Sequence, residues 1–328
     1  MYDKDFSSFN VIEFFPEKQC EQFSTKTRLD INDNVFSPIE SIHPDAFKQC
    51  IHLEKLSLIR MNLKRPLPSK LFLNLKMLKE LVLCETNLKS LDRDLFIEQT
   101  NLNYLSLSFN RINNIDPLLF KNLSNLGSLS LSNNEIEFLE EKTFENLKFL
   151  YFLNLSSNKF RQIQQGLFFN LENLFSLNLD YNQIEILDGQ VFDSLKKLEN
   201  LFLNNNRLDE IHSGLFLNLA HLKRLKLSYN NLTSLVANVF VGLENLRFLS
   251  LSNNHISQIN VNAFDSLTFL EELDLAENQI KHDLDHLVFC KLICLVELHL
   301  TGNPIANMDR TEFYRRYLKS CFGIKVLF

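Results

Sequence analysis

The sequence predicts an α/β solenoid, an architecture in which short coils stack along one axis and share a continuous core. The first observation behind this prediction is a leucine frame, L-x-x-L-x-L, that recurs eleven times at intervals of 24 or 25 residues. A unit of this size cannot bury its own apolar face, so it must stack on its neighbours. The frames begin at Leu53, Leu78, Leu102, Leu126, Leu150, Leu174, Leu198, Leu222, Leu246, Leu270 and Leu295.

Each frame predicts a short β-strand. In the unit that begins at Leu126, Leu129 and Leu131 alternate with small polar residues. This period of two places alternate side chains on opposite faces of a strand. Because the coils stack, the strands are expected to form one parallel sheet.

The second observation is an asparagine at the ninth position of nine consecutive units. A buried amide at this position can bond the free backbone groups of the turn, which water cannot reach. The residues are Asn110, Asn134, Asn158, Asn182, Asn206, Asn230, Asn254, Asn278 and Asn303.

The third observation is a phenylalanine at the nineteenth position, displaced by one residue in the 25-residue units. We interpret these rings as a stacked core on the side away from the sheet, each removing ~150–250 Å² from water. The residues are Phe72, Phe96, Phe120, Phe144, Phe168, Phe192, Phe216, Phe240, Phe264 and Phe289.

Together these positions give a consensus, L-x-x-L-x-L-x-x-N-x-I-x-x-I-x-x-x-x-F-x-x-L-x-x, that resembles the typical 24-residue class of the leucine-rich repeat family. The resemblance covers roughly residues 53–305. This part of the sequence is similar to the ectodomains of Toll-like receptors and related leucine-rich repeat proteins. The resemblance implies a horseshoe with a concave parallel β-sheet and a mostly irregular or short-helical convex side.

We predict three segments along the chain. Residues 29–305 form the solenoid of about 12 units, the first of them degenerate, with a strand at Leu29-Asp30-Ile31. Residues 1–28 form an N-terminal cap in which Phe14, Phe15 and Phe23 are candidates for packing. Residues 306–328 form a C-terminal cap of a helix and a strand, similar to that of intracellular members of the family.

Composition and motifs argue against several functions. A net charge of −6 gives no electrostatic reason to bind nucleic acid. The sequence contains no run of 18 apolar residues, which is the length that would predict a membrane span. Motifs for phosphate, dinucleotide, zinc-peptidase and serine-hydrolase sites are missing. We therefore expect no enzymatic activity, no catalytic residues and no cofactor.

Two segments carry ligand-type side chains, but we expect neither to bind a metal. His282-Asp283-Leu284-Asp285-His286 lies in the outer part of a lengthened unit, where polar residues simply meet solvent. Asp30, Asn32, Asp33 and Asn34 lack the glycine and the distal glutamate of a calcium loop. Buried thiols are the simplest interpretation of the six cysteines, with a Cys20–Cys50 disulfide as the alternative.

The sequence is compatible with two cellular locations. The first residues do not form a secretory signal. The protein is extracellular or at the cell surface if the chain is a fragment that lacks its signal peptide, and otherwise cytoplasmic.

Positions 2, 3, 5, 7 and 8 of each strand segment are expected to face away from the core, and in the middle units they carry aromatic and basic side chains. Exposed aromatic rings in a polar field are typical of protein contact hot spots. The alternative is that the rings merely cover one another on the sheet. The candidate residues are Tyr104, Phe109, Tyr151, Phe152, Phe175, Tyr181, Phe202, Tyr229, Phe248, Lys223, Arg224 and Arg247.

Charged residues on the same surface are arranged so that they could orient a binding partner. A basic cluster around Lys223, Arg224, Lys226 and Arg247 is followed by an acidic one of Glu271, Glu272, Asp274, Glu277 and Glu297. A partner of complementary charge would be aligned by such a pair of clusters. We predict a non-enzymatic recognition module whose concave face binds a protein or peptide; the alternative is an intracellular scaffold or substrate adaptor.

Overall fold

A computed structural model describes residues 11–12, 27–32, 39–318 and 324–328. Its contacts group into two compact units, which are described separately. Unit 1 comprises residues 1–159 and 166–171, and unit 2 comprises residues 160–165 and 172–328.

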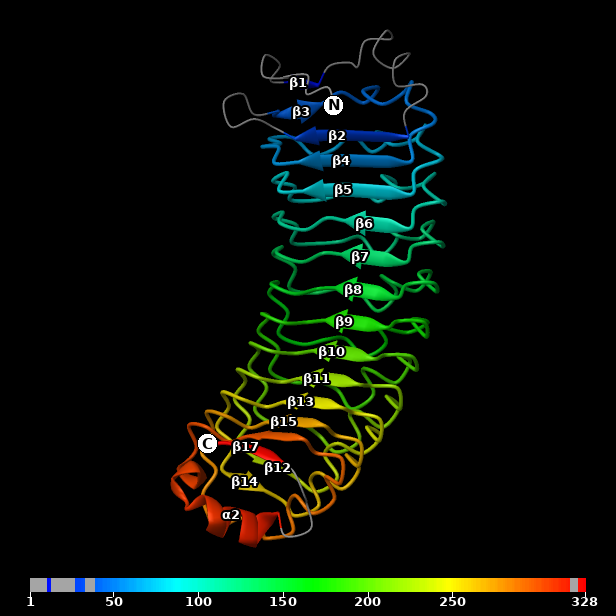
Figure 1. The fold of residues 1–328 in the computed structure, drawn as a ribbon. Coiled ribbons are helices and arrows are strands. Elements are labelled where there is room, and N and C mark those ends of the chain that lie inside the picture. The colour runs from blue at the N-terminus through cyan, green and yellow to red at the C-terminus, as the bar shows by residue number, and fades with distance from the viewer. Residues whose placement is uncertain (1–10, 13–26, 33–38, 319–323) are drawn as a thin grey trace. The chain divides into compact units, whose positions relative to one another are not determined.

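In unit 1 the strands pair in parallel and in chain order, one strand per coil (Figure 1). The register joins equivalent residues of neighbouring coils, so that Leu81 of one coil lies opposite Leu105 of the next. The predicted degenerate strand pairs in the same way, with Leu29 opposite Leu56. The strands are β2 (Arg28–Asn32), β4 (Lys55–Ile59), β5 (Glu80–Cys84), β6 (Tyr104–Ser106), β7 (Ser128–Ser130) and β8 (Phe152–Asn154), with a separate pair of β1 (Val11–Ile12) and β3 (Ser41–Ile42).

Unit 2 repeats this arrangement. Its parallel strands are β9 (Ser176–Asn178), β10 (Asn200–Phe202), β11 (Arg224–Lys226), β13 (Phe248–Ser250), β15 (Glu272–Asp274), β16 (Glu297–His299) and β17 (Lys325–Leu327). A second short sheet pairs β12 (Ser234–Leu235) with β14 (Gln258–Ile259). The predicted parallel solenoid with little helix is confirmed.

The ninth-position asparagines are buried and bonded as predicted. Asn134 is typical: its Nδ2 donates to the carbonyl oxygens of Leu107 at 2.9 Å and Leu131 at 3.1 Å, and its Oδ1 accepts from the backbone N–H of Ile112 at 3.0 Å. One side chain therefore closes its own turn and joins it to the preceding coil. This satisfies backbone groups that are buried away from water.

The nineteenth-position phenylalanines form the buried core opposite the sheet. Phe264 is 1% exposed. Its ring centroid lies 6.0 Å from that of Phe240 and 6.1 Å from that of Phe289, in stacked geometry. The prediction that this stripe is core is confirmed.

The C-terminal segment holds a 3₁₀ helix, η1 (Pro304–Asn307), the helix α2 (Arg310–Tyr317) and strand β17. The side chain of Asp309 caps α2 by accepting from the backbone N–H of Glu312 at 3.0 Å. Phe313 and Tyr317 bury the inner face of the helix. β17 pairs with β16 and extends the sheet of unit 2 by one strand.

Some sequence predictions lie outside the described residues. They concern Phe14, Phe15 and Phe23 of the N-terminal cap, Asp33 and Asn34 of the weak calcium pattern, and the thiols of Cys20 and Cys321. The proposed boundaries of the two caps stay predictions.

Candidate functional site

The strand side chains that point away from the leucine core form an exposed surface on each unit, which we call the open face. In β8, for example, Leu153 is buried while Phe152 and Asn154 on either side of it are half-buried. The alternation follows from the pleat of a strand, whose successive side chains point to opposite sides. Residues two apart on one strand therefore share the open face.

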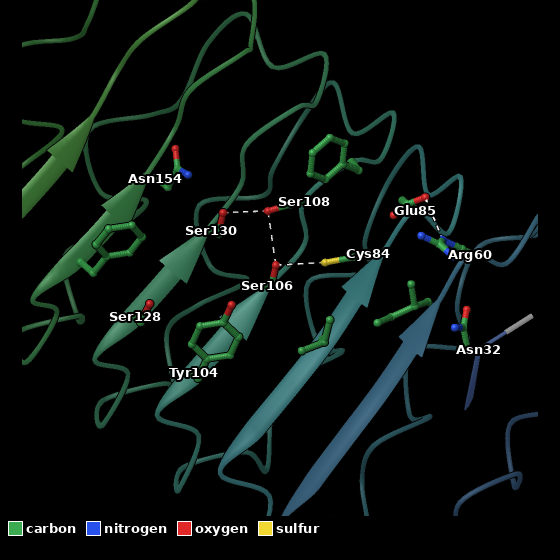
Figure 2. A pocket seen from close by; sticks show the side chains of 14 residues that line it. Asn32, Arg60, Cys84, Glu85, Tyr104, Ser106, Ser108, Ser128, Ser130 and Asn154 are labelled. Carbon is green, nitrogen blue, oxygen red and sulfur yellow. Dashed lines mark hydrogen bonds and ion pairs between the residues drawn. The ribbon is translucent and has the colours of Figure 1, made fainter. Parts of the chain in front are cut away.

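The open face of unit 1 contains a hollow of about 530 Å³. Tyr104, Phe109 and Phe152 lie on its lining together with small polar side chains from several strands (Figure 2). The polar part of the lining includes Asn32, Ser106, Ser108, Ser128, Ser130 and Asn154, and charged groups come from Arg60 and Glu85. Arg60 and Glu85 form an ion pair at 3.5 Å.

A chain of hydrogen bonds runs along the floor of the hollow. Cys84 Sγ lies 3.1 Å from Ser106 Oγ, Ser106 Oγ donates to Ser108 Oγ at 3.3 Å, and Ser108 Oγ lies 2.7 Å from Ser130 Oγ (Figure 2). The hydroxyls of Ser106, Ser108 and Ser130 are thereby satisfied even though these residues are buried. Each hydroxyl can rotate, so the floor can donate to or accept from a polar ligand.

The hollow does not have the features of a cysteine-based catalytic site. Burial raises the pKa of the Cys84 thiol above its ordinary value, although the hydrogen bond with Ser106 acts in the opposite direction. A thiol with a raised pKa is mostly protonated at neutral pH and is a poor nucleophile. Its role in the lining is that of a weak polar contact.

The predicted aromatic residues of unit 1 are accessible. Phe109 is 56% exposed, Tyr151 is 50% exposed and Tyr104 is 38% exposed, while Phe152 is half-buried. Tyr151 lies across the backbone of Gly127: a Cβ there would lie 2.5 Å from its Cε1 atom. A side chain at residue 127 would therefore collide with the Tyr151 ring, which lies close to this backbone.

In unit 2 the predicted aromatic residues divide into two groups. Phe175, Tyr181 and Tyr229 are exposed. Phe202 and Phe248 are half-buried, and the Nζ of Lys226 lies 5.6 Å and 5.8 Å from their ring centroids. Cation–π contact with Lys226 already covers part of these two rings. At this point of the sheet the structure therefore favours the alternative interpretation, in which neighbouring side chains on the sheet cover the rings.

The basic residues predicted in unit 2 are exposed but partly neutralised. Lys223 Nζ lies 2.7 Å from Glu199 Oε2, and Arg247 forms an ion pair with Glu271. Arg224 donates to Asn200 Oδ1 at 3.4 Å. Because Arg247 of the predicted basic cluster pairs with Glu271 of the acidic one, the two clusters are less separate than the sequence alone suggested.

The backbone at the eighth position is left-handed in each of the eleven coils that begin with a leucine frame. We call these residues the eighth-position row, and their φ angles lie between 52° and 75°. Asparagine and glycine adopt this conformation easily, whereas bulky side chains are strained in it. The row consists of Arg60, Glu85, Phe109, Asn133, Ser157, Tyr181, Asn205, Tyr229, Asn253, Glu277 and Gly302.

Three exposed aromatic residues of the predicted surface belong to this strained row: Phe109, Tyr181 and Tyr229. Sequence reasoning identified these side chains by their position but could not see the strain. It also missed the serine floor of the hollow. The available signal was the pair of serines at the fifth and seventh positions of the units that begin at Leu102 and Leu126.

The structure also brings together three ligand-type side chains that sequence analysis did not combine. Among the described residues, one group has the spacing of a metal site, and it consists of Glu272, Glu297 and His299. The His282–His286 segment does not form such a group in the described part of the chain. Nor does the described part contain a helix with the length and apolar character needed to cross a bilayer.

Comparison with solved structures gives many similar folds. A chain in the octameric complex of Latrophilin 3, Unc5D and FLRT2, to which FLRT2 contributes a leucine-rich repeat, is 26% identical with a TM-score of 0.74; the match covers 84% of this chain and 83% of that chain. An internalin, InlF of Listeria monocytogenes, is 24% identical with a TM-score of 0.66, and the match covers 94% and 88% of the two chains.

The Toll–Spatzle complex of Drosophila is 23% identical with a TM-score of 0.57 over 87% of this chain and 46% of that chain, so this chain spans less than half of that relative. No curated protein matches the sequence. The model of the family described as Leucine rich repeat matches residues 100–160, 150–208, 196–256 and 249–305, which together make up more than half of the chain. The chain belongs to the leucine-rich repeat family.

Proposed function

We propose that this protein is a non-enzymatic recognition module that binds a protein or peptide partner on the open face of its sheet. The principal contact in this proposal is the hollow of unit 1, with Tyr104, Phe109, Tyr151 and Phe152 as anchors. The exposed residues Phe175, Tyr181 and Tyr229, with Lys223, Arg224 and Arg247, provide a further surface on unit 2.

The observation that carries the proposal is Phe109. Its ring is 56% exposed, so its burial does not stabilise the fold, and its backbone is left-handed with a φ of 57°. This conformation costs a non-glycine residue roughly 1–2 kcal/mol, and asparagine tolerates it better. An exposed, strained ring beside a polar hollow is therefore explained by a contact that forms outside the chain.

The chemistry of the hollow favours a peptide over a small metabolite. A drug-sized ligand is usually held in a cleft that buries most of its surface, whereas this hollow lies open on the sheet. Rotatable serine hydroxyls suit backbone amides of a partner, and flanking rings suit its apolar side chains. The FLRT2 leucine-rich repeat is found in a complex with other proteins, which supports the same class of partner here.

Affinity capture with two matched variants tests the proposal. The first variant combines Phe109→Asn, Tyr151→Ala and Phe152→Ala. The control combines Phe138→Ala, Phe149→Ala and Phe169→Ala, which removes three exposed rings of the same unit that lie outside the strand segments. We expect the first variant to lose captured partners by at least tenfold, since anchor residues commonly contribute 2 kcal/mol or more, roughly a factor of 30.

The control is expected to retain its partners. Equal capture by the first variant and the unmodified chain, with both folded by circular dichroism, would remove the open face of unit 1 from the proposal. Loss in the control alone would move the binding surface to the segments outside the strands.

A further inference from the structure

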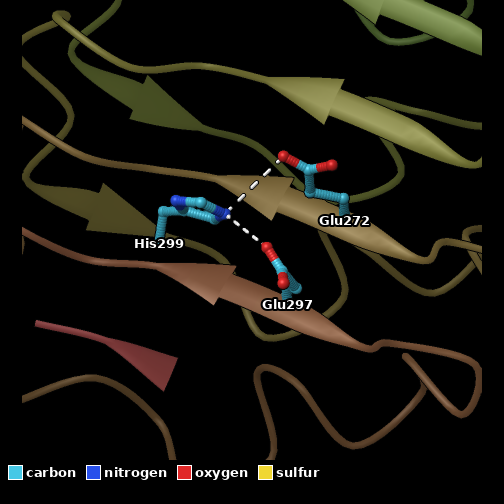
Figure 3. Close-up of side chains that lie close together, drawn as sticks. All are labelled: Glu272, Glu297 and His299. Atoms are coloured by element: carbon cyan, nitrogen blue, oxygen red, sulfur yellow. Dashed lines mark ion pairs between the residues drawn. The ribbon is translucent and has the colours of Figure 1, made fainter. Parts of the chain in front are cut away.

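Two neighbouring strands of unit 2 present a histidine and two glutamates to one point of the open face (Figure 3). Glu297 and His299 are two residues apart on β16 and so share one face. Glu272 on β15 is the register partner of Glu297. Parallel pairing thus brings together three ligand-type side chains that are separated by up to 27 residues in sequence.

The distances suit a small divalent ion. His299 Nε2 lies 3.3 Å from Glu297 Oε2 and 3.6 Å from Glu272 Oε1, and the three ligand atoms all lie within 4.8 Å of one another. Zinc binds nitrogen and carboxylate oxygen at 2.0–2.2 Å in tetrahedral geometry, which places any two ligand atoms roughly 3.3–3.5 Å apart. Only small side-chain rotations are needed to close the site.

The environment of His299 gives an independent observation. Its Nε2 atom is shielded from solvent and has no hydrogen-bond partner in the described part of the chain. Both carboxylates lie within ion-pair distance of this atom, but the structure has no hydrogen bond between it and either of them. Since nearly all buried polar atoms in proteins are hydrogen-bonded, a ring nitrogen that lies between two carboxylates without a hydrogen bond calls for a specific explanation. A bound cation would provide one.

Glu297 is also held in the orientation that a ligand needs. Lys325 Nζ donates to its Oε1 at 2.9 Å, which leaves Oε2 directed at His299. Ligating carboxylates are commonly oriented by such outer contacts.

We propose that Glu272, Glu297 and His299 form a binding site for one Zn²⁺ ion, with water at the fourth position. The imidazole nitrogen favours zinc over calcium and magnesium, which prefer sites made of oxygen atoms. Three protein ligands and one open position match the ligand count of open zinc sites. A bound ion would link β15 to β16 and stabilise unit 2, independently of any partner on unit 1.

Isothermal titration of the purified chain with Zn²⁺, after treatment with EDTA and removal of the chelator, tests the site. We expect one ion per chain, with no comparable binding of Ca²⁺ or Mg²⁺. His299→Gln and Glu272→Gln should each weaken Zn²⁺ binding by at least tenfold, because loss even of an outer-shell contact commonly weakens a metal site 10–100-fold. His255→Gln, which changes an exposed histidine on another coil, should bind like the unmodified chain.

Two further measurements make the outcome decisive. Co²⁺ in the unmodified chain should give the strong visible absorption of tetrahedral coordination, and His299→Gln should abolish it. In EDTA the variants should melt at the temperature of the unmodified chain, which shows that they are folded. The proposal is overturned if no saturable Zn²⁺ site is found, if His299→Gln binds as tightly as the unmodified chain (as it would with zinc on the thiols), or if Ca²⁺ binds equally well.

Discussion

The eighth and ninth positions of each coil are adjacent in sequence, yet they are constrained in different ways. At the ninth position Asn134 is 7% exposed, and its amide bonds backbone groups of two coils. At the eighth position Asn133 is half-buried and left-handed, with a φ of 54°. The ninth position is constrained by hydrogen bonds that only one side chain can make, whereas the eighth is constrained by its backbone alone.

This difference separates positions that hold the fold from positions that are free for function. Asparagine occupies the ninth position in nine consecutive units, while the eighth position holds side chains as different as Arg60, Phe109 and Glu277. A backbone constraint excludes few residues outright and only makes bulky ones costly. Where the eighth position carries an aromatic ring, the cost has to be offset by something other than folding.

The largest effect is expected for Asn134→Ala. The substitution leaves the N–H of Ile112 buried without a partner and removes two further hydrogen bonds, to the carbonyls of Leu107 and Leu131. Each of these carbonyls keeps one bond, from the asparagine of a neighbouring coil. We expect the free energy of unfolding to fall by roughly 2–4 kcal/mol, because one stranded buried group costs about 1–3 kcal/mol and each lost hydrogen bond about 0.5–1.5 kcal/mol. Urea denaturation checks this value. A loss below 1 kcal/mol would show that water replaces the amide and that the ninth position is less constrained than its neighbours suggest.

The adjacent Asn133 provides the matched control, since the residue type and the coil are the same. Asn133→Ala should reduce stability by only about 1 kcal/mol, the cost of a left-handed alanine. Asn133→Gly should leave stability nearly unchanged because glycine adopts this backbone freely. The same urea titrations measure both variants. If Asn133→Ala and Asn134→Ala are equally destabilising, the proposed distinction between the two positions is wrong.

Tyr229→Asn tests the eighth-position row with a substitution that is expected to increase stability. Tyr229 is 55% exposed with a φ of 57°, so removal of its ring sacrifices little burial and relieves backbone strain. We expect a gain of about 0.5–1 kcal/mol in the free energy of unfolding. Tyr229→Phe, which keeps the strain, should show no gain. A destabilised Tyr229→Asn would mean that the ring supports the fold, and its place in the proposed binding surface would then be lost.

How much the sequence could predict follows from the same contrast. The leucine, asparagine and phenylalanine positions recur because each coil buries them identically, so their period predicts the solenoid, its parallel strands and its core. The left-handed backbone at Phe109, Tyr181 and Tyr229 leaves no such pattern, because many residue types occupy the eighth position. Strain of this kind becomes visible only in the three-dimensional structure.

The candidate sites depend on pairs of side chains across strands, and this limited their prediction. Arg247 and Glu271 were placed in different clusters, yet the register of their coils makes them an ion pair. His299 was not linked to Glu272 although both lie on neighbouring strands. Alignment of the units by position would have shown these neighbours, but the rotamers that bring the charged atoms together are set by local packing.

The smallest effect is expected at the seventh position, where Asp180 is half-buried. Burial raises the pKa of the Asp180 carboxyl above its ordinary value, although its Oδ1 accepts from the backbone N–H of Asn204 at 2.6 Å. A raised pKa in the folded state means that the group favours folding below its unfolded pKa and that this contribution is lost as the pH rises through the folded pKa.

Asp180→Asn keeps the accepting oxygen but has no charge to desolvate. At pH 7 we therefore expect the variant to be more stable than the unmodified chain by less than about 1 kcal/mol, the usual scale for partly exposed charges. At pH 3 the gain should vanish, since the unmodified carboxyl is then protonated in both states. Urea titrations at the two pH values measure this difference, with Asp209→Asn at an exposed site as the control. If the gain in the free energy of unfolding is the same at both pH values, it arises from altered hydrogen bonding and not from the charge. The seventh position would then be constrained by its hydrogen bonds, as the ninth position is.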